Sequence, residues 1–275
     1  EYIETPENGI INHSMNPINI KNPTIAEKDI SSEGAYKPAA ILHISKLMYA
    51  YNDEINEATK DLGDAGSCMV NINCSPEGLN WQDEKRGVAR ILFNDGTYMY
   101  YCSGTLVNNT LQNGTPYFLT AYHCGAEFTT HSSWQFYFNY ERPGCPNTGT
   151  PPTNMITGCV KRAEGEINGG TDMQLLQLNS TPLLSWNPYY NGWDRSGSTV
   201  TGGASIHHPQ GDAKKISTFT GTTQSSTWSD VDGNIGATNG HWTFPLWEAT
   251  TNGQGVSEGG SSGSPLFNNA GRVIG

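Results

Sequence analysis

The sequence predicts an all-β protein, and three observations support that prediction. The chain of 275 residues contains 32 glycines. Its apolar residues gather in short runs separated by Gly, Ser, Thr and Asn. Charged residues make up only 15% of the chain, below the roughly 25% of an average soluble protein. Many short strands between turn residues favour a sandwich or barrels, and this length fits one large domain or two smaller ones.

The first 62 residues differ from the rest of the chain because they contain no cysteine. Apolar residues between 41 and 55 recur at intervals of three and four, which suits a helix, although some of them also fit an alternating strand. The small and flexible segment 61–67 follows, and it would serve well as a linker or a cleavage site. We therefore place a boundary there.

Short strands dominate from Cys68 onward. Residues 88–93 end at Asn94-Asp95-Gly96, and 97–102 then resumes in strand-like residues, which is typical of a hairpin. Further strand candidates are 103–107, 117–121, 134–140, 173–178, 215–220 and 241–247. The chain ends inside what looks like another strand, so we expect more sequence to follow residue 275 in the intact protein.

Charge and cysteine content narrow the class of protein. The formal net charge is −11, and phosphate binding needs clustered Lys and Arg, so no nucleic-acid partner is expected. Six cysteines without zinc-type spacing favour disulfides and an oxidising compartment. No stretch approaches the roughly 20 apolar residues of a membrane span. We expect a secreted protein whose signal peptide lies outside this chain.

Two motifs point to nucleophilic catalysis. Small residues flank Ser262 in the motif Gly-Ser-Ser-Gly-Ser-Pro, so its hydroxyl can be exposed on a tight turn whose N–H groups hold an oxyanion. His123 follows the apolar run 117–121 and could activate that hydroxyl, while Asp172 is the best candidate to orient the imidazole. Each residue alone has an ordinary structural explanation. The order His, Asp, Ser is the one that chymotrypsin-like enzymes use.

These motifs resemble those of chymotrypsin-fold serine proteases, and the chain is most similar to bacterial lysyl endopeptidases of the Achromobacter protease type. The matching stretches are 66–78, 102–109, 117–125, 190–195, 206–209, 215–217 and 260–265. The resemblance implies two six-stranded antiparallel β-barrels with the catalytic residues in the cleft between them. The first would span 63–183 with His123 and Asp172, and the second would span 184–275 with Ser262 and be incomplete in this chain.

The resemblance also implies a role for each site residue. His123 would act as general base and then as general acid, Asp172 would orient its ring, and Ser262 would form an acyl-enzyme. The N–H groups of Gly260 and Ser262 would form the oxyanion hole. The reaction would need no metal and no cofactor. The partners would be protein or peptide substrates, and we expect a monomer.

By the same resemblance, the chain would contain the disulfides Cys74–Cys145 and Cys102–Cys124. The second would hold the turn that carries His123, and a closed loop of this size is worth about 3 kcal/mol. Cys68 would reach a cysteine beyond residue 275. Cys159 matches no family cysteine, so it either pairs with Cys68 or both lack partners in this chain.

Two departures from trypsin-like enzymes affect activation and specificity. Trypsin-like enzymes place an Asp before the nucleophile and bury it against a new N-terminus, whereas this chain has Ser261 there. Residues 1–62 then look like a propeptide tail, with processing expected between residues 63 and 67. The position of trypsin's specificity acid holds Val256, so we expect the lysine-selecting acid beyond residue 275 and interpret Glu258 as a solvated loop residue.

The leading hypothesis is a secreted serine endopeptidase that cuts after lysine. One alternative is a glutamyl endopeptidase, whose serine turn is often similar, and another is a catalytically silent protease-like module that binds protein. A metal site at His207 and His208 is not expected, because adjacent side chains on a strand point to opposite faces. We expect these two histidines to be structural.

Overall fold

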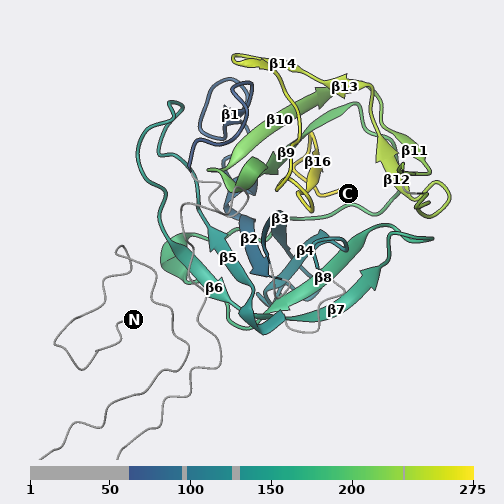
Figure 1. Ribbon diagram of the computed structural model, residues 1–275, viewed down its shortest axis with the longest axis horizontal. Helices are drawn as coiled ribbons and strands as arrows, with labels where there is room; N and C mark the ends of the chain where they lie inside the picture. The colour runs from purple at the N-terminus through teal and green to yellow at the C-terminus, as the bar shows by residue number, and fades with distance from the viewer. Residues whose placement is uncertain (1–61, 95–97, 126–130, 232) are drawn as a thin grey trace, which may run out of the picture. The chain divides into compact units, whose positions relative to one another are not determined.

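The computed structural model describes residues 62–275 except 95–97, 126–130 and 232. Figure 1 shows the strands in two groups, with β2 to β8 in the lower one and β9, β10 and β16 in the upper one. The helices among these residues are single 3-10 turns at Glu84–Arg86, His131–Ser133, Leu184–Trp186 and Pro209–Gly211. The predicted all-β class is confirmed. The helix expected between residues 41 and 55 lies outside the described residues.

The lower group is an antiparallel sheet of seven strands in the order β6-β5-β2-β3-β4-β8-β7. Its strands are β2 (Val88–Asn94), β3 (Met99–Val107), β4 (Tyr117–Ala121), β5 (Gln135–Phe138), β6 (Asn154–Thr157), β7 (Cys159–Gly165) and β8 (Met173–Leu178). One face packs on a core in which Phe118 meets Phe136 edge-on, with ring centroids 5.0 Å apart. Burying a side chain of this kind contributes about 1.5–3 kcal/mol.

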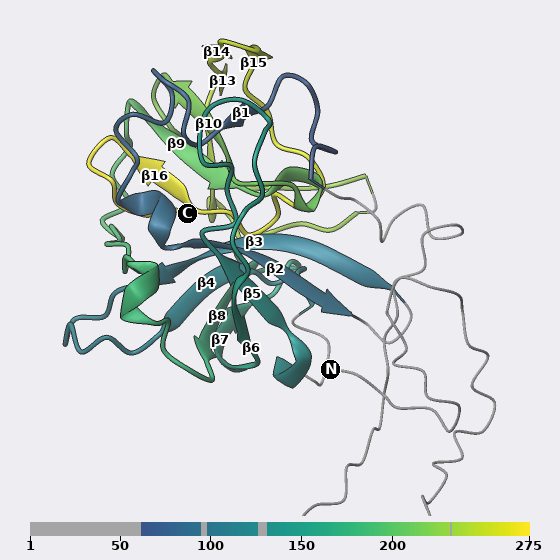
Figure 2. The same ribbon diagram turned by 90° about the vertical axis from the view of Figure 1, so that its left-hand side faces the viewer.

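The upper group is a five-stranded sheet in the order β1-β10-β9-β16, with β13 also paired to β10. Its strands are β1 (Val70–Asn71), β9 (Gly202–His207), β10 (Lys215–Thr220), β13 (Leu246–Trp247) and β16 (Leu266–Asn268). Every residue of β9 is buried, and the strand is central in the sheet, with β10 paired on one side and β16 on the other. Figure 2 shows the same separation of the two groups from the side.

Two short hairpins complete the upper group. They pair β11 (Gln224–Ser226) with β12 (His241–Thr243) and β14 (Ala249–Thr250) with β15 (Gly253–Gln254). The two main sheets have seven and five strands, rather than the six in each barrel that the resemblance implied. The barrel count and the proposed domain ranges stay predictions.

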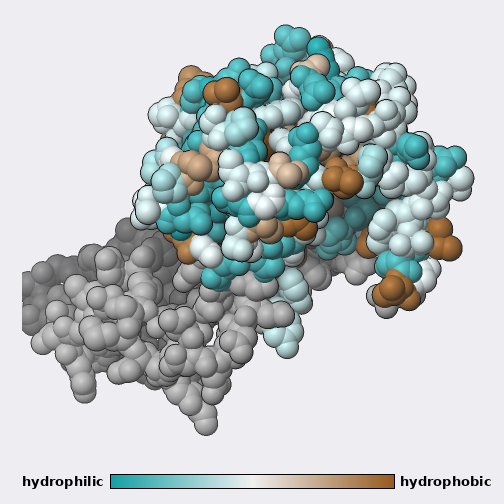
Figure 3. All heavy atoms as spheres, turned by 90° about the horizontal axis from the view of Figure 1, so that it is seen from above, coloured by the Kyte–Doolittle hydropathy of each residue, from teal (hydrophilic) through white to brown (hydrophobic). Residues whose placement is uncertain are grey.

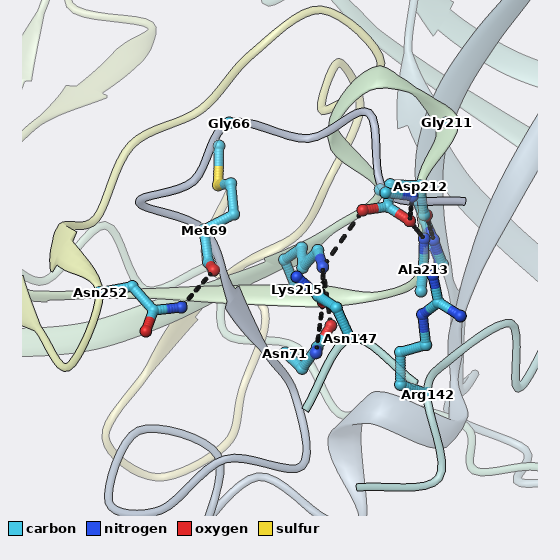
Figure 4. A network of polar contacts seen from close by, with 12 residues as sticks. Gly66, Met69, Asn71, Arg142, Asn147, Gly211, Asp212, Ala213, Lys215 and Asn252 are labelled. Carbon is cyan, nitrogen blue, oxygen red and sulfur yellow. Dashed lines mark hydrogen bonds and ion pairs between the residues drawn. The ribbon is translucent and has the colours of Figure 1, made fainter. Parts of the chain in front are cut away.

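β1 belongs to the upper sheet, although residues 70–71 fall within the range 63–183 that we expected for the first barrel. A buried polar network explains why the strand is held there (Figure 4). The ammonium of Lys215 on β10 donates to Asn71 Oδ1 at 2.7 Å and lies 3.2 Å from Asp212 Oδ2. Asn71 in turn donates to Asn147 Oδ1 at 2.8 Å. These contacts join β1 to the strand beside it and to a distant loop.

The strand predictions are confirmed at 117–121, 173–178 and 215–220. The prediction of two separate strands at 97–102 and 103–107 is wrong, because β3 pairs without a break along β2 from Met99 to Thr105. The run 241–247 divides into β12 and β13, since Pro245 between them lacks the N–H that a ladder needs. β9 was missed because it begins with two glycines, and β6 and β7 because their few apolar residues are interrupted by polar ones.

The disulfides Cys74–Cys145 and Cys102–Cys124 are both present, with S–S distances of 2.02 and 2.04 Å. Within the described residues Cys68 and Cys159 are unpaired. Cys159 is buried, which raises the pKa of its thiol to about 12. No helix in the described part of the chain is both long and apolar enough to cross a membrane. On the face seen in Figure 3, apolar side chains form small separate groups among polar ones.

Candidate active site

Two neighbouring strands bring His123 and Asp172 together. Ala121 at the end of β4 and Met173 at the start of β8 are cross-strand partners, and the two candidate residues lie just beyond that pair. Although they are 49 residues apart in the sequence, His123 Nδ1 lies 2.7 Å from Asp172 Oδ2. The backbone N–H of His123 also donates to Asp172 Oδ1 at 3.0 Å. One carboxylate therefore holds both the ring and the backbone of the histidine.

The backbone of Asp172 is fixed in an uncommon conformation. Its φ of 51° lies in the left-handed region, which residues other than glycine adopt infrequently and Asp and Asn adopt more readily than most. Two hydrogen bonds hold it there: its N–H donates to Glu166 O at 3.2 Å, and its carbonyl accepts from Tyr122 N at 3.1 Å. The loop before β8 thus presents the carboxylate to His123 from a defined direction.

The contact with Asp172 selects the tautomer of the neutral imidazole. An ionised carboxylate can only accept hydrogen bonds, so Nδ1 of His123 must carry the proton that it donates. In the neutral ring, Nε2 is then left with a lone pair and can accept a proton. The His123 side chain is 42% exposed, which leaves this nitrogen accessible to an incoming substrate. An oriented imidazole with a free lone pair on Nε2 is the arrangement that general-base catalysis requires.

The turn that carries Ser262 rests on the middle of β3 and the end of β4. The carbonyl of Ser262 accepts from Ser103 N at 2.8 Å, and the sulfur of Cys124 lies 3.6 Å from the same oxygen. At position 263 a β-carbon would overlap Thr120 Oγ1 and Ser103 O, so only glycine lets the turn come this close. The serine turn thus contacts the segment directly beside His123, and the Cys102–Cys124 disulfide fixes that segment.

The structure brings His123 and Asp172 into direct contact, whereas Ser262 reaches the same region through its backbone. Among the described residues, the hydroxyl of Ser262 makes no hydrogen bond, and none joins it to His123. Hydrogen bonds between catalytic groups are often long in free enzymes and shorten when substrate binds. The Ser262 turn therefore adjoins the segment that carries His123, and its contacts with that segment run through backbone atoms.

The two expected oxyanion donors lie on either side of Ser261. Gly260 has φ +90°, and a β-carbon there would lie 2.8 Å from His208 O, so the position requires glycine. Its carbonyl accepts from Ser103 Oγ at 2.9 Å. Within the described part of the chain, the N–H groups of Gly260 and Ser262 donate to no acceptor. Both are therefore available to a ligand oxygen.

A cavity of about 280 Å³ adjoins Ser262. Aromatic side chains of Phe244 and Trp247 form part of its wall, with their ring centroids 4.6 Å apart. Glu258 also lines it, and both carboxylate oxygens lie 3.2 Å from the N–H of Gly66. Glu258 lies in a loop and is half-buried, so its interpretation as a solvated loop residue stays a prediction, although a distant segment contacts its carboxylate. A larger cavity of about 480 Å³ contains none of the three candidate residues, so we do not assign the chemistry to it.

The comparison with known families identifies this chain. Residues 62–275 match the family described as lysyl endopeptidase, C-terminal domain. The chain belongs to the lysyl endopeptidase family. A lysyl endopeptidase of Pseudomonas aeruginosa is 30% identical over 220 residues, which cover 76% of this chain and 43% of that protein. The chain thus spans less than half the length of this curated relative. The resemblance drawn from the motifs is confirmed.

Solved structures of proteases are similar in outline to this member of the lysyl endopeptidase family. A thermostable serine protease from an extremophilic microorganism is 16% identical, with a TM-score of 0.45, over 70% of this chain and 83% of its own. An HtrA-type protease with a bound tripeptide is 15% identical, with a TM-score of 0.43, over 71% of this chain and 52% of its own.

Sequence reasoning missed Ser103, which binds the serine turn through two hydrogen bonds. Its N–H donates to Ser262 O, and its hydroxyl donates to Gly260 O. The same hydroxyl accepts from His208 N at 2.9 Å, so one buried side chain connects three segments. No sequence signal marked it, because a serine inside a predicted strand is usually read as a solvent-facing residue.

Proposed function

We propose that this chain is a secreted serine endopeptidase that cuts after lysine through an acyl-enzyme, with His123, Asp172 and Ser262 as its triad. The observation that carries the proposal is the 2.7 Å contact between His123 Nδ1 and Asp172 Oδ2, beside a serine turn that contacts β3 and β4. Membership of the lysyl endopeptidase family supports both the reaction class and the lysine preference.

The reaction then proceeds in two halves. Ser262 Oγ attacks the scissile carbonyl carbon while its proton passes to Nε2 of His123. The tetrahedral intermediate collapses with cleavage of the C–N bond, and Nε2 gives its proton to the leaving amine. Water repeats the sequence on the acyl-enzyme, since His123 can take a proton from it in turn. The acid is released and the hydroxyl of Ser262 is restored.

Two groups of dipoles and charges lower the barriers of these steps. Asp172 keeps the proton on Nδ1 and stabilises the imidazolium that forms during each attack. The N–H groups of Gly260 and Ser262 donate to the carbonyl oxygen as it becomes negative. Such a donor is worth about 2.7–4 kcal/mol of transition-state stabilisation.

The cavity beside Ser262 supports a basic rather than an acidic primary side chain. The carboxylate of Glu258 attracts a lysine ammonium and repels a glutamate side chain in the same cavity. We therefore expect Glu258→Gln to lower kcat/KM for lysine substrates roughly 10- to 150-fold, since a charged hydrogen bond is worth about 1.5–3 kcal/mol. The matched control is Glu248→Gln, which removes the same charge elsewhere. An unchanged kcat/KM would mean that Glu258 only holds the Gly66 segment.

Labelling with a fluorophosphonate probe tests the nucleophile. We expect the full chain to be labelled at Ser262, Ser262→Ala to remain unlabelled, and Ser198→Ala to be labelled like the parent. Ser198 is an exposed serine whose side chain makes no hydrogen bond among the described residues, so it is a matched control. A folded parent protein that stays unlabelled would favour the silent binding module.

Cleavage-site mapping tests the specificity separately. A denatured protein substrate is digested and its fragments are identified by mass spectrometry. Fragments ending in lysine support the proposal. Fragments ending in glutamate would establish the glutamyl alternative instead.

A further inference from the structure

His207 has a place in the fold that its interpretation as a structural histidine does not explain. It ends β9, is 1% exposed, and directs its ring to the serine turn. Nδ1 lies 2.6 Å from the hydroxyl of Ser261, the residue between the two candidate oxyanion donors. Nε2 lies 3.3 Å from the hydroxyl of Ser217 on the neighbouring strand β10. Both ring nitrogens are therefore engaged by hydroxyls.

The hydrogen-bond partners fix the direction of each proton. Ser217 Oγ lies 2.8 Å from Val256 O and can only donate to that carbonyl, which uses its single proton. It must then accept from Nε2–H of His207. The ring is neutral with its proton on Nε2, so Nδ1 accepts the proton of Ser261. Ser261 Oγ itself accepts from Glu258 N at 3.1 Å, which completes the chain.

The charged surroundings agree with a neutral ring. Burial, followed by the positive charge of Lys215, lowers the pKa of His207 to about 3. Lys215 is its cross-strand partner, and the Lys215 ammonium is directed to Asn71 and Asp212 (Figure 4). A neutral imidazole with one donor and one acceptor can satisfy two hydroxyls at once, whereas an imidazolium cannot accept from Ser261.

We propose that His207 is a positioning residue that fixes the oxyanion turn through the hydroxyl of Ser261. This inference rests on the proposed function, because it assigns the N–H groups of Gly260 and Ser262 to catalysis. We call the chain of hydrogen bonds that runs from Val256 O through Ser217, His207 and Ser261 to Glu258 N the relay. It holds the segment before the nucleophile at Val256 and at Ser261. It involves Ser261, which stands where trypsin-like enzymes have the Asp of a buried Asp–ammonium pair, and it uses only neutral groups, two of them on strands β9 and β10.

The expected effect is on the rate of the chemical step. Displacing a catalytic group by about 1 Å can cost about 100-fold, so His207→Leu and Ser261→Ala should each lower kcat by about that factor. KM should change little, because the substrate contacts are intact. His207→Asn keeps an acceptor near the position of Nδ1 and should recover part of the loss. His241→Asn is the matched control, since it removes a histidine of β12 outside this network.

The experiment measures kcat and KM for a lysine ester, together with the inhibition constant of a peptide boronate that mimics the oxyanion. A relay predicts that the double variant His207→Leu/Ser261→Ala loses no more than either single variant. It also predicts parallel losses in kcat and in boronate affinity. Ser261→Ala removes only one hydroxyl, so it tests the relay even if His207→Leu does not fold.

Two outcomes separate this inference from the proposed function. A parent that hydrolyses the ester while folded Ser261→Ala and His207 variants retain full kcat overturns the positioning role alone. A parent that neither hydrolyses nor is labelled overturns the proposed function. Long-range ¹H–¹⁵N NMR of the histidine rings gives a readout independent of activity: we expect the proton of His207 on Nε2, and a proton on Nδ1 would contradict the relay.

Discussion

Replacing Asp172 with asparagine tests the contact that joins two of the three candidate triad residues. The aspartate accepts two hydrogen bonds from His123, one from Nδ1 at 2.7 Å and one from the backbone N–H at 3.0 Å. Asparagine has one oxygen and one NH₂ group in the same space, so it can accept only one of them. If its oxygen keeps the backbone N–H, its NH₂ group faces Nδ1.

The consequence for the imidazole is a change of tautomer. Nδ1 must then accept a hydrogen bond, so the proton moves to Nε2, which can no longer take a proton from Ser262. In a serine-protease triad this exchange lowers kcat by about 10⁴-fold. At about 1.36 kcal/mol for each factor of ten, that is roughly 5.4 kcal/mol of transition-state stabilisation. Fold stability should change far less, because the side chain is only partly buried and keeps one hydrogen bond.

The assay compares kcat for a lysine ester between the parent and Asp172→Asn, with thermal unfolding as the check on folding. We expect a loss of about 10⁴-fold with a nearly unchanged unfolding temperature. Glu166→Gln is the control, because only the backbone of that residue contacts Asp172. A folded Asp172→Asn variant that loses less than about tenfold, or about 1.4 kcal/mol, would refute the assignment of Asp172 as the orienting group.

Three further predictions follow from other parts of the structure. The double substitution Cys102→Ala/Cys124→Ala should lower the free energy of unfolding by about 3 kcal/mol in denaturant titrations, and it should also reduce labelling of Ser262. If both values are unchanged, this disulfide does not support the site. In a Cys68→Ser variant, Ellman's reagent should react with almost no thiol in the native protein and with Cys159 only in denaturant, because burial raises the pKa of Cys159 to about 12. Rapid reaction of the native variant would show that this thiol is accessible. Burial lowers the folded pKa of His207 to about 3, below about 6.5 when unfolded, so the unfolded state binds its proton more tightly. The contribution of His207 to the free energy of unfolding should therefore be fully present above about pH 6.5 and fall by up to about 1.4 kcal/mol per pH unit towards pH 3. In unfolding measured at several pH values, His207→Asn should flatten that slope.

The sequence predicted the parts of the fold and site that depend on local pattern. The apolar runs 117–121 and 173–178 were visible as strands, and their pairing explains why His123 and Asp172 meet. The motif around Ser262 was visible because only small residues permit that turn. These features need nothing beyond residue type, alternation and spacing.

The remaining features depend on contacts between distant segments. β9 begins with two glycines, which argue against a strand, yet it is central because β10 and β16 pair with it on both sides. Ser103 and His207 are ordinary residues in the sequence, and their roles arise only when β3 and β9 reach the serine turn. Glu258 likewise gained a partner from the distant residue Gly66. A pattern in one segment contains no information about such partners.

The neutral relay at Ser261 changes what must happen for the oxyanion turn to form. In a trypsin-like enzyme the corresponding Asp needs a positive partner, because an unpaired buried carboxylate is costly. Ser261 needs only one acceptor and one donor, which His207 Nδ1 and Glu258 N supply within the same folded unit. The turn can therefore take its shape when β9 and β10 pair, since no charge has to be created at a new chain end.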